Sequence, residues 1–258
     1  MNDPHVVKLK YRLTTIDLVK FEDPEPINME AEAFRIVLRD GLLVVEFKDH
    51  FSSVKSARAT AESFLRAWEI DNALRMNRLE IRFVYEDAEV IDRNPSPDRA
   101  LQTIQINGID SQMSIGGDLV VSVARHSYPA PPEAFQVNTN VESLWQRYER
   151  YLNGQEPLLS MAYFVLTWLE DYAGGRDAAA HRFAIPARVL STLGKLTANR
   201  GDATTARKRH AESATPLTGR EKLWIEAVVK SIIRRFGQVD LGNTLDELEM
   251  DDLPNGPR

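Results

Sequence analysis

The chain has 258 residues, of which 43% are apolar and 27% charged, and its formal net charge is −6. This content is enough for a buried core, and the absence of cysteine excludes disulfides, Cys-ligated zinc, iron–sulfur clusters and thiol nucleophiles. The longest apolar stretch, 158–169, is too short to span a bilayer, and the amino terminus lacks the apolar region of a secretory signal. We therefore expect a cytoplasmic protein with no membrane partner.

The net charge conceals a strong asymmetry along the chain. Residues 1–175 carry 18 basic and 27 acidic side chains, residues 176–237 carry 13 and 5, and residues 238–258 carry 1 and 6. The segments therefore have net charges of −9, +8 and −5. A basic block can mark a polyanion partner, because Lys and Arg release counterions when they neutralise phosphates. The alternative is an Arg-rich helical surface that the acidic segments neutralise within the fold.

The first half of the chain has the pattern of β-strands. In residues 8–13, apolar and basic residues alternate, as in a strand with one buried face. Apolar runs at 34–38 and 42–47 flank Asp40-Gly41, which supplies the positive φ angles of a type I′ hairpin turn. Further strands are expected at 79–85, 101–106 and 118–123.

One long helix is expected in this half, from a cap at Ser52 or Ser53 to about Met76, with apolar residues at helical spacing. Pro-Ala-Pro-Pro at 129–132 can continue neither a strand ladder nor a helix, so it marks the expected domain boundary. Residues 1–128 are therefore predicted to form an α+β domain, a mostly antiparallel sheet with one long helix.

The second half has a helical pattern and is predicted to be an all-α bundle over 133–237. Its expected helices run from a cap at Asn140 to Leu152 and over 156–172, with shorter helices starting near Asp177 and Pro186. The second is apolar nearly all round, which is typical of the central helix of a bundle.

A capping box at 218–221 opens the last helix, which is expected to carry Leu223 on its apolar side and to end at Gly237. Residues 238–258 are predicted to be an acidic, flexible tail.

The sequence carries few of the familiar catalytic patterns. The sequence contains no phosphate-binding glycine loop, dinucleotide fingerprint, nucleophile elbow or paired-histidine metalloprotease helix. Its 5 histidines lie at no familiar metal-ligand spacing, and a solvated strand end is the favoured interpretation of Asp49-His50. We therefore expect neither a metal nor a cofactor.

One constellation has possible catalytic meaning. Arg176 is followed directly by the polar Asp177 and, after three alanines, by His181. Together with the order of the helices, this pattern resembles the HEPN superfamily of helical bundles over about residues 140–237. The resemblance implies a metal-independent ribonuclease motif in which His181 moves the proton of a ribose 2′-OH and Arg176 holds the scissile phosphate.

In that family the motif usually lies just before the last long helix. The segment at that place here, 199–208, has Thr205 where the histidine would be. We therefore expect a HEPN-like bundle with a degenerate site, which binds RNA or another polyanion and in which nuclease activity is not favoured. The alternative is a generic helical bundle in which Arg176 pairs with Asp171 or Asp177.

The RNA contacts would come from the basic block. The candidates are Arg176, His181, Arg200, Arg207, Lys208 and Arg209. A second hypothesis is DNA binding, because residues 180–193 are similar in spacing to a helix-turn-helix whose usual turn glycine is replaced by Ala184. Arg188, Lys195 and Arg200 would then face the groove or the phosphates.

A third hypothesis is a non-catalytic protein-interaction or self-association module. In it, the sheet domain offers an edge strand, and the acidic tail docks on a partner or on the basic block itself.

Overall fold

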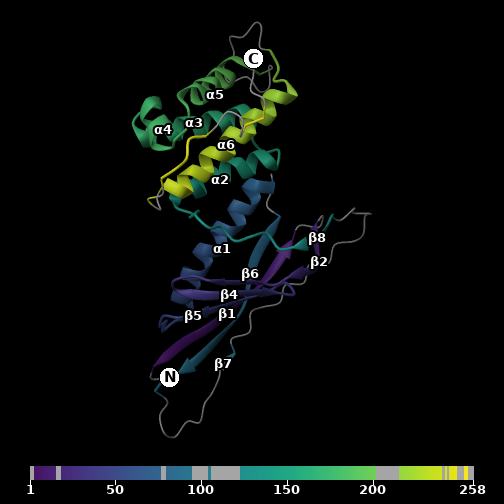
Figure 1. Cartoon of the computed structure of the whole chain (residues 1–258), viewed down its shortest axis with the longest axis vertical. Helices are drawn as coiled ribbons and strands as arrows, with labels where there is room; N and C mark the ends of the chain where they lie inside the picture. Colours follow the sequence, from purple (N-terminus) through teal and green to yellow (C-terminus); the bar gives the residue numbers. More distant parts are fainter. Residues whose placement is uncertain are drawn as a thin grey trace. The chain divides into compact units, whose positions relative to one another are not determined.

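A computed structural model describes residues 3–15, 19–76, 80–94, 104–105, 123–201, 215–239, 242, 244–248 and 253–254. The chain divides into two compact units, Met1–Pro132 (unit 1) and Glu133–Arg258 (unit 2). Unit 1 carries the strands and one long helix, and unit 2 carries the other described helices (Figure 1). The predicted α+β fold class is confirmed.

The main sheet of unit 1 has the described strand order β3–β4–β5–β1–β6–β7, and each neighbouring pair is antiparallel. A second sheet pairs two further strands, β2 and β8, in parallel. The bounds are β1 Pro4–Thr15, β2 Val19–Glu25, β3 Ile27–Glu30, β4 Phe34–Arg39, β5 Leu42–Phe47, β6 Ile81–Asp92, β7 Ile104–Gln105 and β8 Val123–Ser127.

The strand predictions met different outcomes. The hairpin is confirmed: Asp40 and Gly41 have φ angles of 51° and 71°, as a type I′ turn between β4 and β5 requires. Strand β7 lies inside the strand expected over 101–106. Strand β8 begins at residue 123, the last residue of the strand expected over 118–123. Residues 118–122 lie outside the described residues. Strands β2 and β3 were not predicted from the sequence pattern.

The core of unit 1 lies between the main sheet and helix α1 (Val54–Met76). The Ser53 hydroxyl accepts a hydrogen bond from the Ser56 amide at 3.2 Å, so Ser53 caps the helix as expected. Trp68 is fully buried in this core, and its indole nitrogen donates to the Pro129 carbonyl at 3.1 Å. Pro129, the first proline of the expected boundary segment, therefore accepts a hydrogen bond from the core of unit 1.

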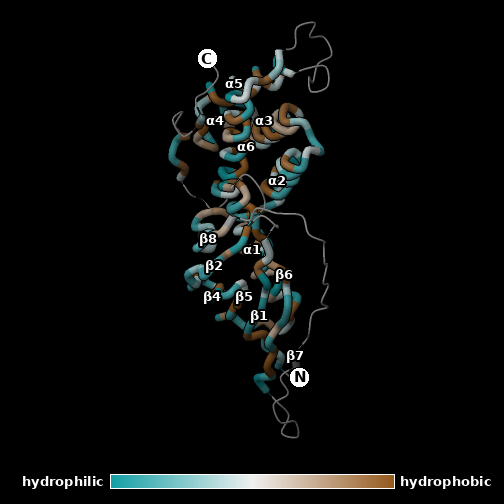
Figure 2. Tube along the Cα trace, turned by 90° about the vertical axis from the view of Figure 1, so that its right-hand side faces the viewer, coloured by the Kyte–Doolittle hydropathy of each residue, from teal (hydrophilic) through white to brown (hydrophobic). Residues whose placement is uncertain are grey.

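Unit 2 is built from five described helices, and α3 contacts each of the other four. Figure 2 shows alternating hydrophobic and hydrophilic bands along these helices, as amphipathic packing requires. Helix α3 therefore takes the central position that the sequence predicted for the most apolar helix. The bounds are α2 Thr139–Leu152, α3 Leu158–Ala173, α4 Arg176–Arg182, α5 Ala187–Asn199 and α6 Gly219–Val239.

Two helix ends differ from the prediction. Helix α2 is capped by Asn138, whose side chain accepts from the Val141 amide at 2.8 Å, whereas Asn140 lies inside the helix and accepts from Trp168 on α3. Helix α6 continues past Gly237 to Val239. A Cβ at Gly237 would overlap the Phe135 ring, so this glycine permits a close approach instead of ending the helix.

The last helix and the tail also depart from expectation. Leu223 is 59% exposed and therefore does not belong to the apolar side of α6. In the tail, Leu248 and Leu253 are buried, and the Leu248 amide donates to the Ala184 carbonyl at 2.9 Å. The described part of the predicted flexible tail is thus anchored on unit 2. None of the described helices is both long and apolar enough to cross a membrane.

Candidate nucleic-acid interface

The described members of the predicted contact residues lie on two helices of unit 2 and directly after the second helix. Arg176 and His181 lie on α4, Arg188 and Lys195 lie on α5, and Arg200 follows α5 directly. The remaining predicted residues, Arg207, Lys208 and Arg209, lie outside the described residues.

Arg176 lies at the start of α4 and reaches across to the neighbouring helices. Its Nε donates to Glu170 on α3 at 2.6 Å, so its carboxylate partner is Glu170 and neither Asp171 nor Asp177. Its Nη2 lies 3.2 Å from the position that a Cβ would take at Gly194 on α5. The missing side chain at Gly194 therefore gives the guanidinium room against α5.

His181 lies on a different side of α4. Five positions separate it from Arg176 on this seven-residue helix, which corresponds to a rotation of about 140° around the helix axis. His181 is exposed, and its imidazole has no hydrogen bond or ion pair with the described residues. Because the two side chains diverge, α4 does not by itself bring them to one phosphodiester.

The structure instead brings Arg176 together with Lys195. Both line an open groove of about 470 Å³ between α3 and α5, which we call the α3–α5 groove. Leu166 and Gly194 contribute its apolar and small lining. The other polar side chains that line it are Tyr163, Thr167, Glu170, Ser191 and Asn199. A groove with two cations, hydroxyls and an amide offers several donors to an anion.

Arg188 extends this basic surface along α5. It lies seven positions before Lys195, so the two residues share one face about two helical turns apart. Both are exposed, and neither has a carboxylate partner among the described residues. Their charges are therefore available to an external anion.

Arg200 is engaged within the fold. Its Nε and Nη2 donate to one oxygen of Glu221 at 3.0 and 2.8 Å, and the other oxygen accepts from the Thr218 amide and hydroxyl. Burial alone would raise the pKa of Glu221, but the hydrogen bonds from Thr218 and Arg200 outweigh it and lower that pKa. The predicted capping box is thus confirmed, and it holds Arg200 in a structural ion pair.

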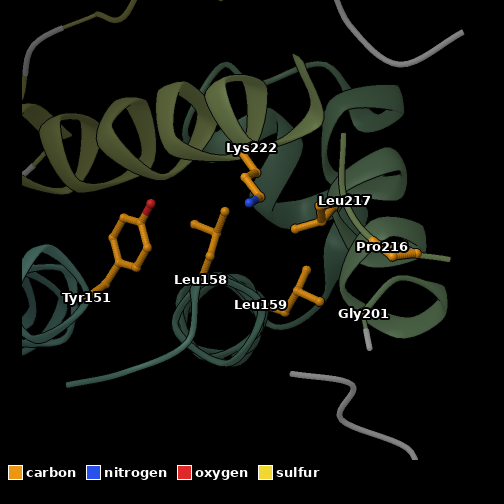
Figure 3. Close-up of a pocket in the computed structure, with 7 residues that line it drawn as sticks. All are labelled: Tyr151, Leu158, Leu159, Gly201, Pro216, Leu217 and Lys222. Carbon is orange, nitrogen blue, oxygen red and sulfur yellow. The ribbon is translucent and has the colours of Figure 1, made fainter. Parts of the chain in front are cut away.

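A second hollow of unit 2, about 250 Å³, lies beside α2, α3 and α6 (Figure 3). Its walls are largely aliphatic, and Figure 3 shows the Lys222 side chain descending from α6 toward Leu158. Tyr151 also lines it, but the Tyr151 hydroxyl is hydrogen-bonded to Glu226. With a single cation, this hollow is a weaker anion site than the α3–α5 groove.

No group of three or more His, Asp or Glu residues that could hold a metal occurs within the described ranges. The closest arrangement is in unit 1, where His5 Nδ1 and His50 Nδ1 are 3.2 Å apart. Asp3 lies 3.5 Å from His50 Nε2, on the far side of that ring, so the three side chains do not converge. Burial, with the nearby Arg93 and His50, lowers the pKa of His5 and favours a neutral imidazole.

Sequence reasoning identified the cations of the interface but missed two residues that shape it. Glu170 and Gly194 belong to different helices and approach Arg176 only when α3, α4 and α5 pack together. The one available signal was Gly194 itself, because a glycine inside a helix is unfavourable unless packing requires it.

Comparisons of the chain with family models, with curated proteins and with solved structures found no match.

Proposed function

We propose that unit 2 binds RNA through the α3–α5 groove and the adjoining face of α5. The observation that carries the proposal is the meeting of Arg176 and Lys195 in one groove. Arg188 adds a third cation on the same side of α5 as Lys195. The segment that contains all three, 176–237, has a net charge of +8 in an otherwise acidic chain.

The spacing of these cations suits a phosphate backbone. Arg188 and Lys195 are separated by about 10 Å along the axis of α5, so the two cations can contact different phosphates of one nucleic-acid strand. Glu170 neutralises part of the Arg176 charge, but a guanidinium has five N–H donors and can hold a phosphate while it holds a carboxylate. Binding of this kind is electrostatic and independent of base sequence.

Binding without cleavage is the favoured form of the proposal. A ribonuclease of the kind that the HEPN resemblance implies needs its arginine and histidine at one phosphodiester. Arg176 and His181 lie about 140° apart around α4, which argues against such a pair. The HEPN-like resemblance supports the proposal through its helix order.

Double-stranded DNA is the second candidate. Ala184, between α4 and α5, has a φ of 48°, which is the left-handed conformation that the turn of a helix-turn-helix requires. Helix α5 would then be the recognition helix, with Arg188 and Lys195 facing the duplex. This version adds a requirement for two-fold dimers with half-sites about one duplex turn apart.

The test is a titration of the full chain against a fluorescent single-stranded RNA and against a DNA duplex. The salt concentration is varied between about 50 and 200 mM, a range over which electrostatic binding to nucleic acid weakens strongly. Three phosphate contacts give a slope of about −2 for log affinity against log salt. Lys195→Ala should weaken RNA binding and reduce the slope by about 0.7. Lys222→Ala, which removes an exposed lysine from the same unit outside the groove, is the matched control and should change neither.

Absence of RNA binding, or binding that is insensitive to salt, would overturn the proposal. Equal losses in Lys195→Ala and Lys222→Ala would move the contact away from the groove. Tighter binding of the duplex than of the single strand, by a dimer, would favour the DNA alternative. Cleavage of the RNA that persists with chelator and disappears in His181→Ala would restore the ribonuclease hypothesis.

A further inference from the structure

The C-terminal segment returns from the end of α6 to the turn between α4 and α5. Figure 1 shows this yellow segment running back along unit 2. The Leu248 amide donates to the Ala184 carbonyl at 2.9 Å, and Leu248 is only 6% exposed. Leu253 is likewise only 5% exposed. Two buried leucines in a segment of strongly acidic composition indicate a docked peptide, because a segment of such charge otherwise favours solvent.

The docking place is bordered by arginines. Ala184 stands between Arg182, the last residue of α4, and Arg188, in the first turn of α5, and both arginines are exposed. A third arginine, Arg235 on α6, donates to the Phe183 carbonyl at 2.6 Å and lines a hollow of about 400 Å³ together with Asp246. The described part of the segment therefore contacts the α4–α5 turn between two arginines and lines a hollow beside a third arginine on α6.

Acidic residues immediately precede the anchor. Asp246 and Glu247 are the two residues before Leu248, and both are exposed. One residue spans at most about 3.5 Å, so the Leu248–Ala184 hydrogen bond holds these carboxylates within a few residue lengths of Arg182 and Arg188. Over the whole segment 238–258, the net charge is −5, opposite in sign to the +8 of residues 176–237.

We propose that this C-terminal segment is a built-in competitor of RNA, docked by Leu248 at the α4–α5 turn. This inference rests on the proposed function, since it names the regulator of the same basic surface. The anchor at Ala184 lies four positions before Arg188, and Asp246 lines the hollow beside Arg235, so the docked segment brings its carboxylates to the edge of the basic surface that an RNA backbone would approach. RNA and the segment therefore exclude each other, and release of the segment exposes the complete surface.

The competition should change the apparent dissociation constant for RNA by a measurable factor. When only a fraction of the molecules is competent to bind, the apparent dissociation constant is the intrinsic one divided by that fraction. If the segment is docked in about 90% of molecules, its release tightens RNA binding about tenfold. Removal of its charge alone leaves the leucine anchors in place, so a smaller gain of about threefold is expected.

The experiment compares the full chain with two variants, using a fluorescent single-stranded RNA of about 16 nucleotides, near the upper end of single-strand site sizes. Leu248→Ala removes the anchor and should bind about tenfold more tightly. Asp246→Asn/Glu247→Gln retains the anchor and should bind about threefold more tightly. Glu22→Gln/Glu32→Gln removes the same charge from exposed positions of unit 1 and should bind as the parent does. Circular dichroism confirms that each variant is folded.

A second measurement follows the anchor directly. Saturation of the full chain with RNA should accelerate hydrogen exchange of the Leu248 amide, because the competitor must leave when RNA binds. Unchanged RNA affinity in both tail variants, or unchanged exchange at Leu248, would overturn the competitor while leaving RNA binding by unit 2 intact. Failure of the parent and of both tail variants to bind RNA would overturn the competitor and the proposed function together.

Discussion

Unit 1 and unit 2 both carry basic side chains on a strand or a helix, but the two units differ in whether these side chains are paired with carboxylates. On β1 of unit 1, three successive outward-facing cations each meet a carboxylate of a neighbouring strand: Lys8 with Glu46 at 2.9 Å, Lys10 with Asp87 at 3.5 Å and Arg12 with Glu86 at 2.7 Å. On α5 of unit 2, Arg188 and Lys195 have no such partner among the described residues.

The difference shows that a count of charges along the sequence says little about binding. In the sheet, strand register places each of these cations beside an acid, whereas α5 places Lys195 in the wall of an open groove. Arg200 demonstrates the same point inside the basic block, since its charge is taken up by Glu221. Four substitutions can break or sharpen this contrast.

The largest effect is expected for Glu221→Ala. It removes the carboxylate half of the capping box of α6 and the partner of Arg200, so the free energy of unfolding should fall by about 2–3 kcal/mol. The lowered pKa of Glu221 means that its contribution is complete above the unfolded-state value near pH 4 and is lost as the pH falls through the folded-state value. Urea unfolding at several pH values measures this loss. Lys222→Ala, at the next position, should cost little, and a Glu221→Ala deficit undiminished in strong acid would contradict the assignment.

Glu170→Gln should strengthen RNA binding. It frees Arg176 from its carboxylate partner while preserving the shape of the side chain, so the groove gains about one full positive charge. We expect about fivefold tighter binding, equivalent to about 1 kcal/mol, and a salt slope steeper by about 0.7. Anisotropy titrations at several salt concentrations provide both values. The control is Asp171→Asn, at an exposed neighbour; an equal gain there would mean that overall charge and not the groove is responsible.

Gly194→Ala tests why a glycine lies inside α5. The substitution removes an unfavourable helix residue, which is worth up to about 1 kcal/mol of stability. The added Cβ would stand 3.2 Å from Arg176 Nη2, the mobile end of a side chain that can shift by a few tenths of an ångström. Thermal unfolding should show a higher melting temperature, and an RNA titration should show slightly weaker binding. A lower melting temperature would show that Arg176 cannot move away from the added Cβ.

The smallest effect is expected for Lys10→Ala on the sheet. A partly exposed pair of this kind contributes about 0.5 kcal/mol, so chemical denaturation should show a slight loss of stability. RNA affinity should remain that of the parent, because Lys10 lies in unit 1 and its charge is already matched by Asp87. A reduction comparable to that of Lys195→Ala would erase the distinction between the two units.

Local features of the fold could be predicted from the sequence where a few adjacent residues decide them. Asp40-Gly41 and the Thr218–Glu221 capping box are confirmed because their chemistry acts over a span of a few residues. The cap of α2 was misplaced by two positions because two asparagines compete there, and only the extended backbone of Asn138 decides between them. Strand β2 contains Asp23-Pro24, which is unfavourable in a strand, and β3 has only four residues, too few for its alternation to identify a strand, so their pairing comes from neighbouring strands.

The candidate interface could be predicted only in part. The basic composition of 176–237 and the exposure of Arg188 and Lys195 follow from sequence pattern. The groove does not, because it requires α3, α4 and α5 to pack in one particular way and depends on the Glu170–Arg176 pair. The anchored tail was missed because composition predicts solvation and gives no information on where an isolated leucine finds a pocket.

Strand β1 has a further consequence for how the chain folds. It is made first, yet one of its two partners is β6, and Lys10 and Asp87 are separated by 77 positions in the sequence. Closure of so long a loop must precede this pairing, whereas the β4–β5 hairpin closes across two residues. During synthesis, β1 therefore waits with an unpaired edge until β6 emerges, and the joining of β1 and β6 is expected to be the slow step in the folding of unit 1.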